Sequence, residues 1–290
     1  MIRKLMLAVL LSLFGTGAAH ASGTCSVSSG GIAFGTFSGS QVTNIGSIVL
    51  ICVGNGNTNY TVTLSTGSGT YATRLMKNGT PSLSYNLYKD AAHTQIWGDG
   101  TGGSTTFTGT INIQGNGSAT VTIPLYAKLP AQTTPAQGGY SDTIVVTAFN
   151  TQASVTGSFL VTAVVQPACT ISATTLAFGT YTGVQADAQS QISLNCTNYA
   201  AWNIGLNAGT FAGATVTTRK MTGPSSSSLA YSLYRDAART LNWGNTVGTD
   251  TVGGTGTGLA QTVPVYGRLL PSQTVPSGSY QDTIVATVTF

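Results

Sequence analysis

Residues 140–166, which read YSDTIVVTAFNTQASVTGSFLVTAVVQ, decide how this chain folds. Apolar and polar residues alternate on both sides of the central NTQAS, and this period of two predicts β-strands at 142–149 and 155–166. In the second strand one face collects the apolar side chains, with Gly157 leaving a gap: Val155, Phe159, Val161, Ala163 and Val165. Flexible linkers are usually polar, so a stretch this apolar is expected to join a sheet.

The same alternation recurs in TVTLS at 61–65, TINI at 110–113 and ATVTIPLYAKL at 119–129. Between two of these runs, QGNGS at 114–118 predicts a hairpin turn, because Asn-Gly readily supplies positive φ. One helix-like patch, at 89–95, is too short to change the fold class. Many short strands separated by turn signals are typical of an all-β sandwich.

The chain also repeats itself. LSYNLYKDAAHTQIWGDG at 83–100 corresponds to LAYSLYRDAARTLNWGNT at 229–246, and the closing YSDTIVVTAF corresponds to YQDTIVATVTF at 280–290. The repeat predicts two tandem sandwich domains, residues 22–166 and 167–290, each of ordinary domain size.

The four cysteines follow the repeat. Cys25 and Cys52 recur as Cys169 and Cys196, and both pairs have a spacing of 27. In an exported protein the economical pairing is one disulfide in each domain, Cys25–Cys52 and Cys169–Cys196, worth roughly 3–4 kcal/mol each in the chain-entropy model. Zinc is the alternative, but no Cys-x-x-Cys occurs and His93 is the only histidine beyond the leader described next.

Residues 1–21 are expected to be a signal peptide. Arg3 and Lys4 precede an apolar run of ten residues, and the small-x-small sequence Ala19-His20-Ala21 offers a cleavage site. A membrane anchor is the rival interpretation, but the run is too short to span a bilayer. The protein is therefore expected to be exported.

Charge is scarce in this sequence. Charged residues make up 6% of the chain, and no Glu is present. Without Arg3 and Lys4, nine basic residues face seven acidic ones. Such a balance argues against nucleic acid, which requires clustered Lys and Arg to neutralise its phosphates.

Residues suited to catalysis are few, so we expect no enzyme, cofactor or metal. His93 aligns with Arg239, which argues against a general base at that place. The repeated acids Asp90/Asp236 and Asp142/Asp282 are expected in turns or caps. The repeated aromatic residues are expected in corner or core packing rather than in a sugar platform: Tyr140/Tyr280, Trp97/Trp243 and Tyr85/Tyr231. GGTGTG at 253–258 follows no βαβ pattern, so we interpret it as a loop.

The two copies differ in what surrounds them. In domain 2 the last strand carries Ile284, Ala286, Val288 and Phe290 on one face, and no counterpart of 155–166 follows. An open apolar edge of this kind is expected to accept a strand from another chain. Only Ser22, Gly23 and Thr24 separate the expected cleavage site from Cys25, so we expect no strand there to donate.

A resemblance explains this asymmetry. The Cys followed by FGT, the LxYxLYxDAAxTxxWG block and the closing YxDTI resemble the spore coat protein U family, which includes pilus subunits of archaic chaperone–usher systems. That resemblance implies immunoglobulin-like domains that lack their last strand. A periplasmic chaperone first supplies the strand, and the next pilin subunit then replaces it at an outer-membrane usher.

Applied to this chain, the resemblance implies a tip subunit on the surface of a Gram-negative cell, active in attachment and biofilm formation. Domain 1 would be completed in cis by 155–166 and would bind the ligand, while domain 2 would be the acceptor pilin domain. A secreted coat protein without a pilus, or an extracellular binding module, remains the alternative.

Strand direction places the connection after residue 149 at the end of domain 1 remote from domain 2. The ligand site is therefore expected on loops there, built from Gly54, Asn55, Asn57, Asn59, Asn150 and Gln152. These loops carry no large hydrophobic residue, which argues against the hydrophobic adhesion found in the family. Both an abiotic surface and a host glycan stay open as ligands.

Overall fold

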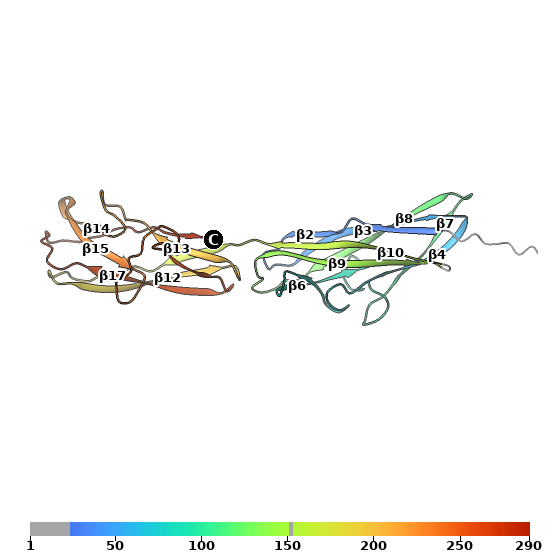
Figure 1. Cartoon of the computed structure of the whole chain (residues 1–290), viewed down its shortest axis with the longest axis horizontal. Coiled ribbons are helices and arrows are strands. Elements are labelled where there is room, and N and C mark those ends of the chain that lie inside the picture. Colours follow the sequence, from blue (N-terminus) through green and yellow to red (C-terminus); the bar gives the residue numbers. More distant parts are fainter. Residues whose placement is uncertain (1–23, 151–152) are drawn as a thin grey trace, which may run out of the picture.

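The structure, a computed structural model, describes residues 24–150 and 153–290. They form two β-domains that lie end to end along the long axis of the molecule (Figure 1). A single 3₁₀ turn, Pro224–Ser226, is the helical segment in the described ranges, and none of their helices is long and apolar enough to cross a membrane. The predicted all-β class with two tandem domains is confirmed. The expected signal peptide lies outside the described residues.

Domain 1 consists of ten strands. They are β1 (Thr24–Ser29), β2 (Ile32–Thr36), β3 (Val42–Val53), β4 (Gly56–Leu64), β5 (Arg74–Lys77), β6 (Ser82–Tyr88), β7 (Phe107–Ile113), β8 (Ser118–Leu129), β9 (Gly138–Phe149) and β10 (Ser154–Val165). Hydrogen bonds join them in the order β1-β3-β8-β6-β5-β9-β10-β2, and β4 pairs with both β7 and β9. Side chains from the whole path meet in one hydrophobic core.

The alternation in the sequence explains how this core forms. Along β8, Ile123, Leu125, Ala127 and Leu129 are buried, while the residues that alternate with them face outward or lie at the margin. Successive strand residues point to opposite faces, so a period of two gives one face to the core.

A turn does form after β7, and Gly115 and Asn116 both adopt positive φ. The predicted hairpin is nevertheless wrong, because β7 pairs with β4 whereas β8 pairs with β3 and β6. The turn joins the two halves of the sandwich.

Domain 2 repeats the plan with fewer strands. They are β11 (Cys169–Ala173), β12 (Ala186–Cys196), β13 (Ala201–Leu206), β14 (Arg219–Thr222), β15 (Ser228–Tyr234), β16 (Val252–Thr255), β17 (Ala260–Leu269) and β18 (Ala286–Thr289). One sheet has the order β11-β12-β17-β15-β14 and the other β16-β13-β18. In both domains a tryptophan is fully buried and donates its indole N–H to a strand carbonyl, Trp97 to Val62 and Trp243 to Ile204.

The repeated acids hold loops, as expected. Asp90 and Asp236 accept the backbone N–H groups of the residues four and five positions later, which closes the following turn. Before the last strand of each domain, a tyrosine donates its hydroxyl to the carbonyl four residues earlier, Tyr140 to Ala136 and Tyr280 to Pro276, both at 2.7 Å. These contacts fit the structural roles predicted from the repeat.

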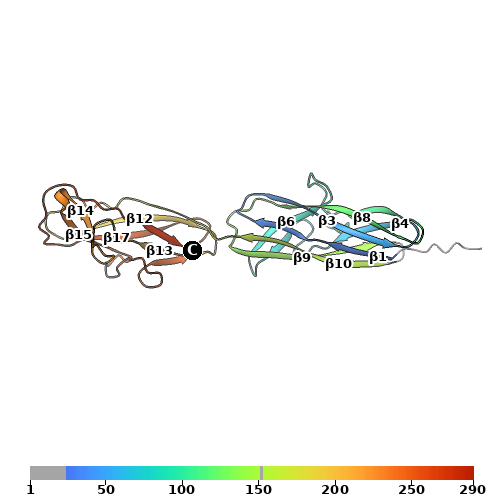
Figure 2. The same ribbon diagram turned by 90° about the horizontal axis from the view of Figure 1, so that it is seen from above.

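The domains meet at a short junction beyond β10. The backbone N–H of Gln137 donates to the Asn198 carbonyl at 2.9 Å, and its side-chain amide donates to the Tyr199 carbonyl at 2.9 Å. Asn198 in turn donates to the Thr134 carbonyl at 3.3 Å. The turned view shows that the chain crosses between the domains as a single segment (Figure 2).

Candidate strand-acceptor site

Domain 1 shows how a sandwich of this type is closed. β10 pairs antiparallel with β9 over its whole length, from Ser154 opposite Phe149 to Val165 opposite Gly138. Its other edge pairs in parallel with β2. β10 therefore lies between the two strands (Figure 1).

The inward face of β10 is made of the residues that share one register in the sequence. Phe159, Val161, Ala163 and Val165 are buried, and Val155 is half-buried against the same core. At Gly157 a Cβ would lie 2.9 Å from the Val27 carbonyl oxygen, so this glycine allows the backbone of β1 to approach.

In domain 2 the corresponding position holds no strand of the described chain. β18 is the outer strand of its sheet. Residues 176–180 repeat the sequence pattern of β2 but lie outside any strand. In domain 1 the equivalent segment, β2, is a strand because it pairs with β10. Residues 176–180 have no such neighbour to pair with.

The loss of this neighbour exposes side chains that the first domain buries. Ile32 and Phe34 of β2 are 3% and 6% exposed, whereas their counterparts Leu176 and Phe178 are only half-buried. Both still pack against the edge of the domain 2 core. The role of these two residues was not predicted from the sequence, although Phe34-Gly35-Thr36 recurs as Phe178-Gly179-Thr180 and was a signal for them.

The opposite edge is equally incomplete. β9 has twelve residues, whereas β18 has four. Ile284, Ala286 and Val288 are half-buried at positions where domain 1 buries its residues fully, and Phe290 is 54% exposed. The predicted edge residues thus share one face beside the core, apart from the exposed terminal Phe290.

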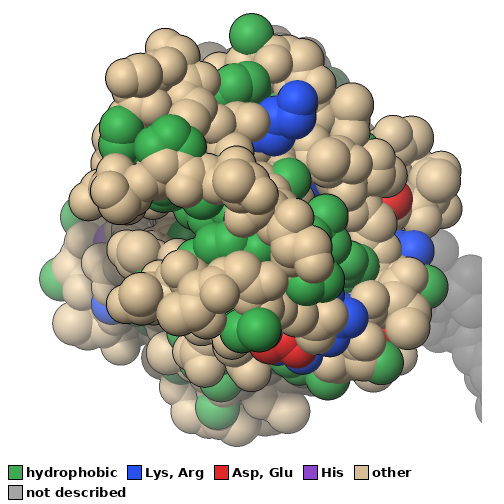
Figure 3. Space-filling model, turned by 90° about the vertical axis from the view of Figure 1, so that its left-hand side faces the viewer, with side chains coloured by type: hydrophobic (Ala, Val, Ile, Leu, Met, Phe, Trp, Pro, Cys, Tyr) green, Lys and Arg blue, Asp and Glu red, His purple; other side chains and the backbone are tan. Residues whose placement is uncertain are grey.

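The two edges, residues 176–180 and β18, flank an apolar strip. Its half-buried side chains are those of Leu176, Phe178, Ile284, Ala286 and Val288. The core cluster of domain 1 contains 28 buried hydrophobic residues and that of domain 2 contains 13, so many domain 2 side chains stay in partial contact with water. Seen from the end of domain 2 opposite domain 1, hydrophobic side chains are visible in the middle of the surface (Figure 3). Unpaired strand edges beside an apolar strip are a ready template for an added strand.

A network of polar contacts lies next to β18. Asp282 accepts the Tyr231 hydroxyl at 2.7 Å and the backbone N–H of Thr210 at 2.8 Å. Burial, together with the bond to Asp282, raises the pKa of Tyr231. Arg219 is fully buried and donates to the Leu206 and Trp243 carbonyls, and this burial lowers its pKa to about 10. These contacts fix the loop next to β18.

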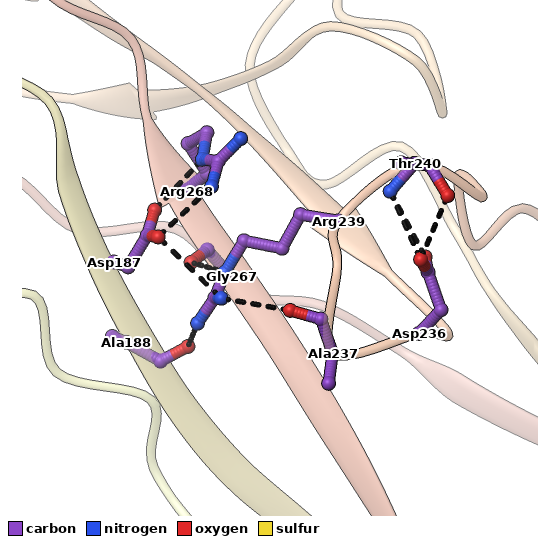
Figure 4. A network of polar contacts seen from close by, with 8 residues as sticks. All are labelled: Asp187, Ala188, Asp236, Ala237, Arg239, Thr240, Gly267 and Arg268. Carbon is purple, nitrogen blue, oxygen red and sulfur yellow. Dashed lines mark hydrogen bonds and ion pairs between the residues drawn. The ribbon is translucent and has the colours of Figure 1, made fainter.

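A charged cluster lies on β12 and β17 (Figure 4). Arg268 makes two hydrogen bonds to Asp187, at 2.8 and 2.9 Å, and Arg239 lies 3.4 Å from the same carboxylate. The bond from Arg268 lowers the pKa of Asp187. Arg239 also donates to the Gly267 carbonyl, so the cluster ties a loop to the sheet. His93, its counterpart, packs between two tyrosine rings instead.

The residues expected to bind a ligand lie at the far end of domain 1, but not all in loops. Asn57 and Asn59 belong to β4, where their side chains accept hydrogen bonds from Asn112 and Thr110 of β7. The predicted loop is therefore wrong beyond residue 55, because β7 extends the sheet there. Gly54 and Asn55 form the bend before β4.

Asn150 lies at the same end of domain 1, in the connection between β9 and β10. Its side chain accepts the backbone N–H of Ala153 at 2.8 Å and donates to Sγ of Cys25 at 3.7 Å. Gln152 lies outside the described residues. A cavity of about 210 Å³ beside Asn150 is lined mainly by apolar groups, among them Leu50, Tyr60, Ala148 and Val155.

Both disulfides join the cysteines paired in the sequence analysis. Cys25 bonds Cys52 and Cys169 bonds Cys196, each linking the first strand of a domain to its neighbour. Within residues 24–150 and 153–290, no three metal-ligating side chains gather at one place.

Comparison with known proteins places this architecture in a family. The chain matches the Spore Coat Protein U domain over residues 12–147 and again over 155–287. Protein U of Myxococcus xanthus is 41% identical over 129 residues, which cover 40% of this chain and 72% of that protein.

Solved structures resemble the fold at low sequence identity. A chain of the CsuC–CsuE chaperone–tip adhesion subunit complex of Acinetobacter baumannii superposes with a TM-score of 0.50 at 15% identity, covering 92% of this chain and 100% of that one. The CupB6 tip adhesin of Pseudomonas aeruginosa gives 0.44 at 12% identity, covering 93% and 95%. With two matches that span most of its length, the chain belongs to the Spore Coat Protein U domain family.

Proposed function

We propose that this protein is the non-enzymatic tip subunit of a chaperone–usher pilus, with domain 1 complete and domain 2 open to a donated strand. One observation carries the proposal. β10 lies between β9 and β2 in domain 1, while in domain 2 the equivalent edges, β18 and residues 176–180, have no strand between them among the described residues.

The boundaries of the family match support the proposal that β10 completes domain 1. The second match begins at residue 155, so the family pattern includes β10 with the second repeat. In space β10 pairs with domain 1. This arrangement supports the proposal that β10 acts as a donor strand in cis. We accordingly assign 22–166 to domain 1 and 167–290 to domain 2.

The proposed partners follow from the open edges. A periplasmic chaperone would cover the strip of domain 2 during export, and at an outer-membrane usher a strand of the next pilin subunit would replace it. The CsuC–CsuE complex is a chaperone bound to a tip subunit, which supports the first of these partners. The mature protein would be displayed at the pilus tip, outside the cell.

Adhesion is assigned to the end of domain 1 that lies away from domain 2. The lining of the apolar cavity of about 210 Å³ at this end includes the polar residues Thr24, Asn150 and Ser154. The ribbon of β4 and β7 lies at the same end and carries polar side chains that bond to one another across the two strands. This combination suits either a glycan or an abiotic surface, and attachment through it would support biofilm formation.

A secreted coat protein is the second candidate function. The observation in its favour is the identity of 41% with Protein U, a relative that matches 40% of this chain. A coat protein would need no chaperone and no usher, so the two functions make opposite predictions about the isolated chain.

Co-expression tests the proposal. Exported alone, the chain should aggregate or be degraded, because the strip on domain 2 is exposed. Co-expressed with a periplasmic pilus chaperone, it should purify as a one-to-one complex. Residues 22–166 alone are the control and should need no chaperone. If the full chain were a stable monomer that does not bind the chaperone, the proposal would be overturned.

A further inference from the structure

A second cavity lies where the two domains meet. Its volume is about 240 Å³, and it is lined by residues 80–83 and 132–136 of domain 1 together with Asn198 and Tyr199 of domain 2. Among the described residues, those that line it include neither a member of the apolar strip of domain 2 nor a residue of the cavity beside Asn150. The cavity is therefore separate from both sites described above, and domain interfaces are a preferred place for ligand sites.

The lining of this cavity is polar but carries no charge. Within the described ranges, no Asp, Lys, Arg or His contributes to it. Thr80, Ser82 and Thr133 bring hydroxyl groups that make no hydrogen bond to another described residue. The side-chain amide of Asn198 donates to the Thr134 carbonyl at 3.3 Å, which leaves its amide oxygen available as an acceptor. The cavity thus offers donors and acceptors to an uncharged polar ligand.

Tyr199 adds an aromatic residue to this lining. It is 62% exposed, and its φ of 64° is a left-handed conformation that costs free energy for a residue with a side chain. Three residues after Cys52 the corresponding position of domain 1 holds Asn55, so the aromatic residue occurs at the junction and not at the free end. On the opposite wall Thr134 also has a positive φ, of 48°. Strained residues of this kind cluster at ligand sites, because the surrounding structure has to hold them in place.

Hydrogen bonds hold the two walls of the cavity in position. Gln137 of domain 1 donates its backbone N–H to the Asn198 carbonyl and its side-chain amide to the Tyr199 carbonyl, both at 2.9 Å. The backbone N–H of Tyr199 donates to the Gly256 carbonyl at 2.9 Å, which anchors the turn to the body of domain 2. A site whose walls are fixed in advance loses little conformational freedom when a ligand binds.

We propose that the cavity between the domains binds a neutral saccharide, with one face of a sugar ring against Tyr199 and the sugar hydroxyls bonded to the polar lining. A sugar ring has apolar C–H faces and a rim of hydroxyl groups, so it matches an aromatic residue combined with hydroxyls and an amide. An anionic sugar would lose its hydration in the cavity without gaining a charged partner. The inference does not rest on the proposed function, which assigns adhesion to the other end of domain 1.

Saturation-transfer NMR on the full chain tests the site. The probes are the methyl glycosides of glucose, galactose, mannose and N-acetylglucosamine at millimolar concentration, with glucuronic acid as the charged comparison. At least one neutral glycoside should receive saturation from the protein, and glucuronic acid should receive none. With that glycoside present, hydrogen exchange should slow at residues 133–137 and 198–200 together, because the ligand touches both domains.

Three variants assign the binding to Tyr199. Tyr199→Asn removes the ring, and asparagine tolerates the left-handed region, so the unfolding midpoint should not fall while the glycoside binds about tenfold more weakly. Tyr199→Phe keeps the ring and should retain most of the affinity. Val184→Ala changes a residue of domain 2 that is 63% exposed and does not line the cavity, and it should bind as the unaltered chain does.

Four results would overturn the proposal. They are the absence of transfer to every neutral glycoside, transfer to glucuronic acid as strong as to the neutral sugars, unchanged affinity in Tyr199→Asn, and protection confined to the end of domain 1 remote from domain 2. None of them bears on the strand-acceptor function, which the chaperone experiment tests by itself.

Discussion

At the scale of single residues, each domain is organised around one buried arginine. Arg74 and Arg219 are both fully buried. Arg74 donates to the carbonyls of Ser65 and Trp97 and to the side chain of Asn86, so its guanidinium joins three segments of domain 1. Burial lowers its pKa, and nearby groups such as Tyr85 and Asp142 oppose that shift.

Replacing Arg74 with leucine should destabilise domain 1 by about 3–5 kcal/mol, because several buried acceptors lose their partner at once. Urea unfolding of the full chain measures the change. Lys128→Leu is the control, since this lysine lies on β8 in the same domain and makes none of these bonds, and it should cost less than about 1 kcal/mol. An equal loss for the two variants would show that the buried network contributes no special stability.

These arginines also mark a limit of prediction from sequence. Arginine is seldom fully buried, so composition gave no reason to place it in a core. Its recurrence in RLMK at 74–77 and RKMT at 219–222 was the available signal. The disulfides were easier to predict, because equal spacing in two copies leaves one economical pairing.

At the scale of elements, β10 determines the difference between the two domains. Its alternating pattern alone predicted a strand, and the pattern predicted its inward face as well. That residues 176–180 do not form a strand could not be predicted in the same way. They share the pattern of β2, but a strand needs a neighbour, and the neighbour is set by the whole sheet rather than by local sequence.

Two adjacent residues test the contribution of β10. Phe159 is 5% exposed and Leu160 is 54% exposed, so they face opposite sides of one strand. Phe159→Ala should cost about 3–5 kcal/mol of domain 1 stability. Leu160→Ala should cost less than about 1 kcal/mol, as surface changes usually do.

Denaturant unfolding followed by near-ultraviolet circular dichroism would measure both variants. Equal effects, or a larger loss at Leu160, would mean that β10 is a surface addition and that the core of domain 1 is complete without it. The interpretation of β10 as a donor strand acting in cis would then be wrong.

At the scale of the whole molecule, the two ends of the chain differ. Domain 1, with the polar ribbon of β4 and β7, lies at one end, and domain 2, the proposed strand acceptor, lies at the other (Figure 1). The hydrogen bonds of Gln137 and Asn198 hold the two together where β10 leads into β11. Sequence reasoning predicted this order of domains, but it could not predict the junction, since its contacts come from loops that have no periodic pattern.

Hydrogen exchange of the intact chain, read by mass spectrometry, tests this asymmetry most directly. Amides of residues 142–149 should exchange slowly, because β10 pairs with all of them and β4 also pairs with 146–149, whereas residues 282–289 should exchange much faster in the free monomer. Adding the chaperone should slow exchange at 282–289 and leave 142–149 unchanged. If 282–289 were already as protected as 142–149 in the free monomer, domain 2 would be closed, and the account of an open acceptor would be contradicted.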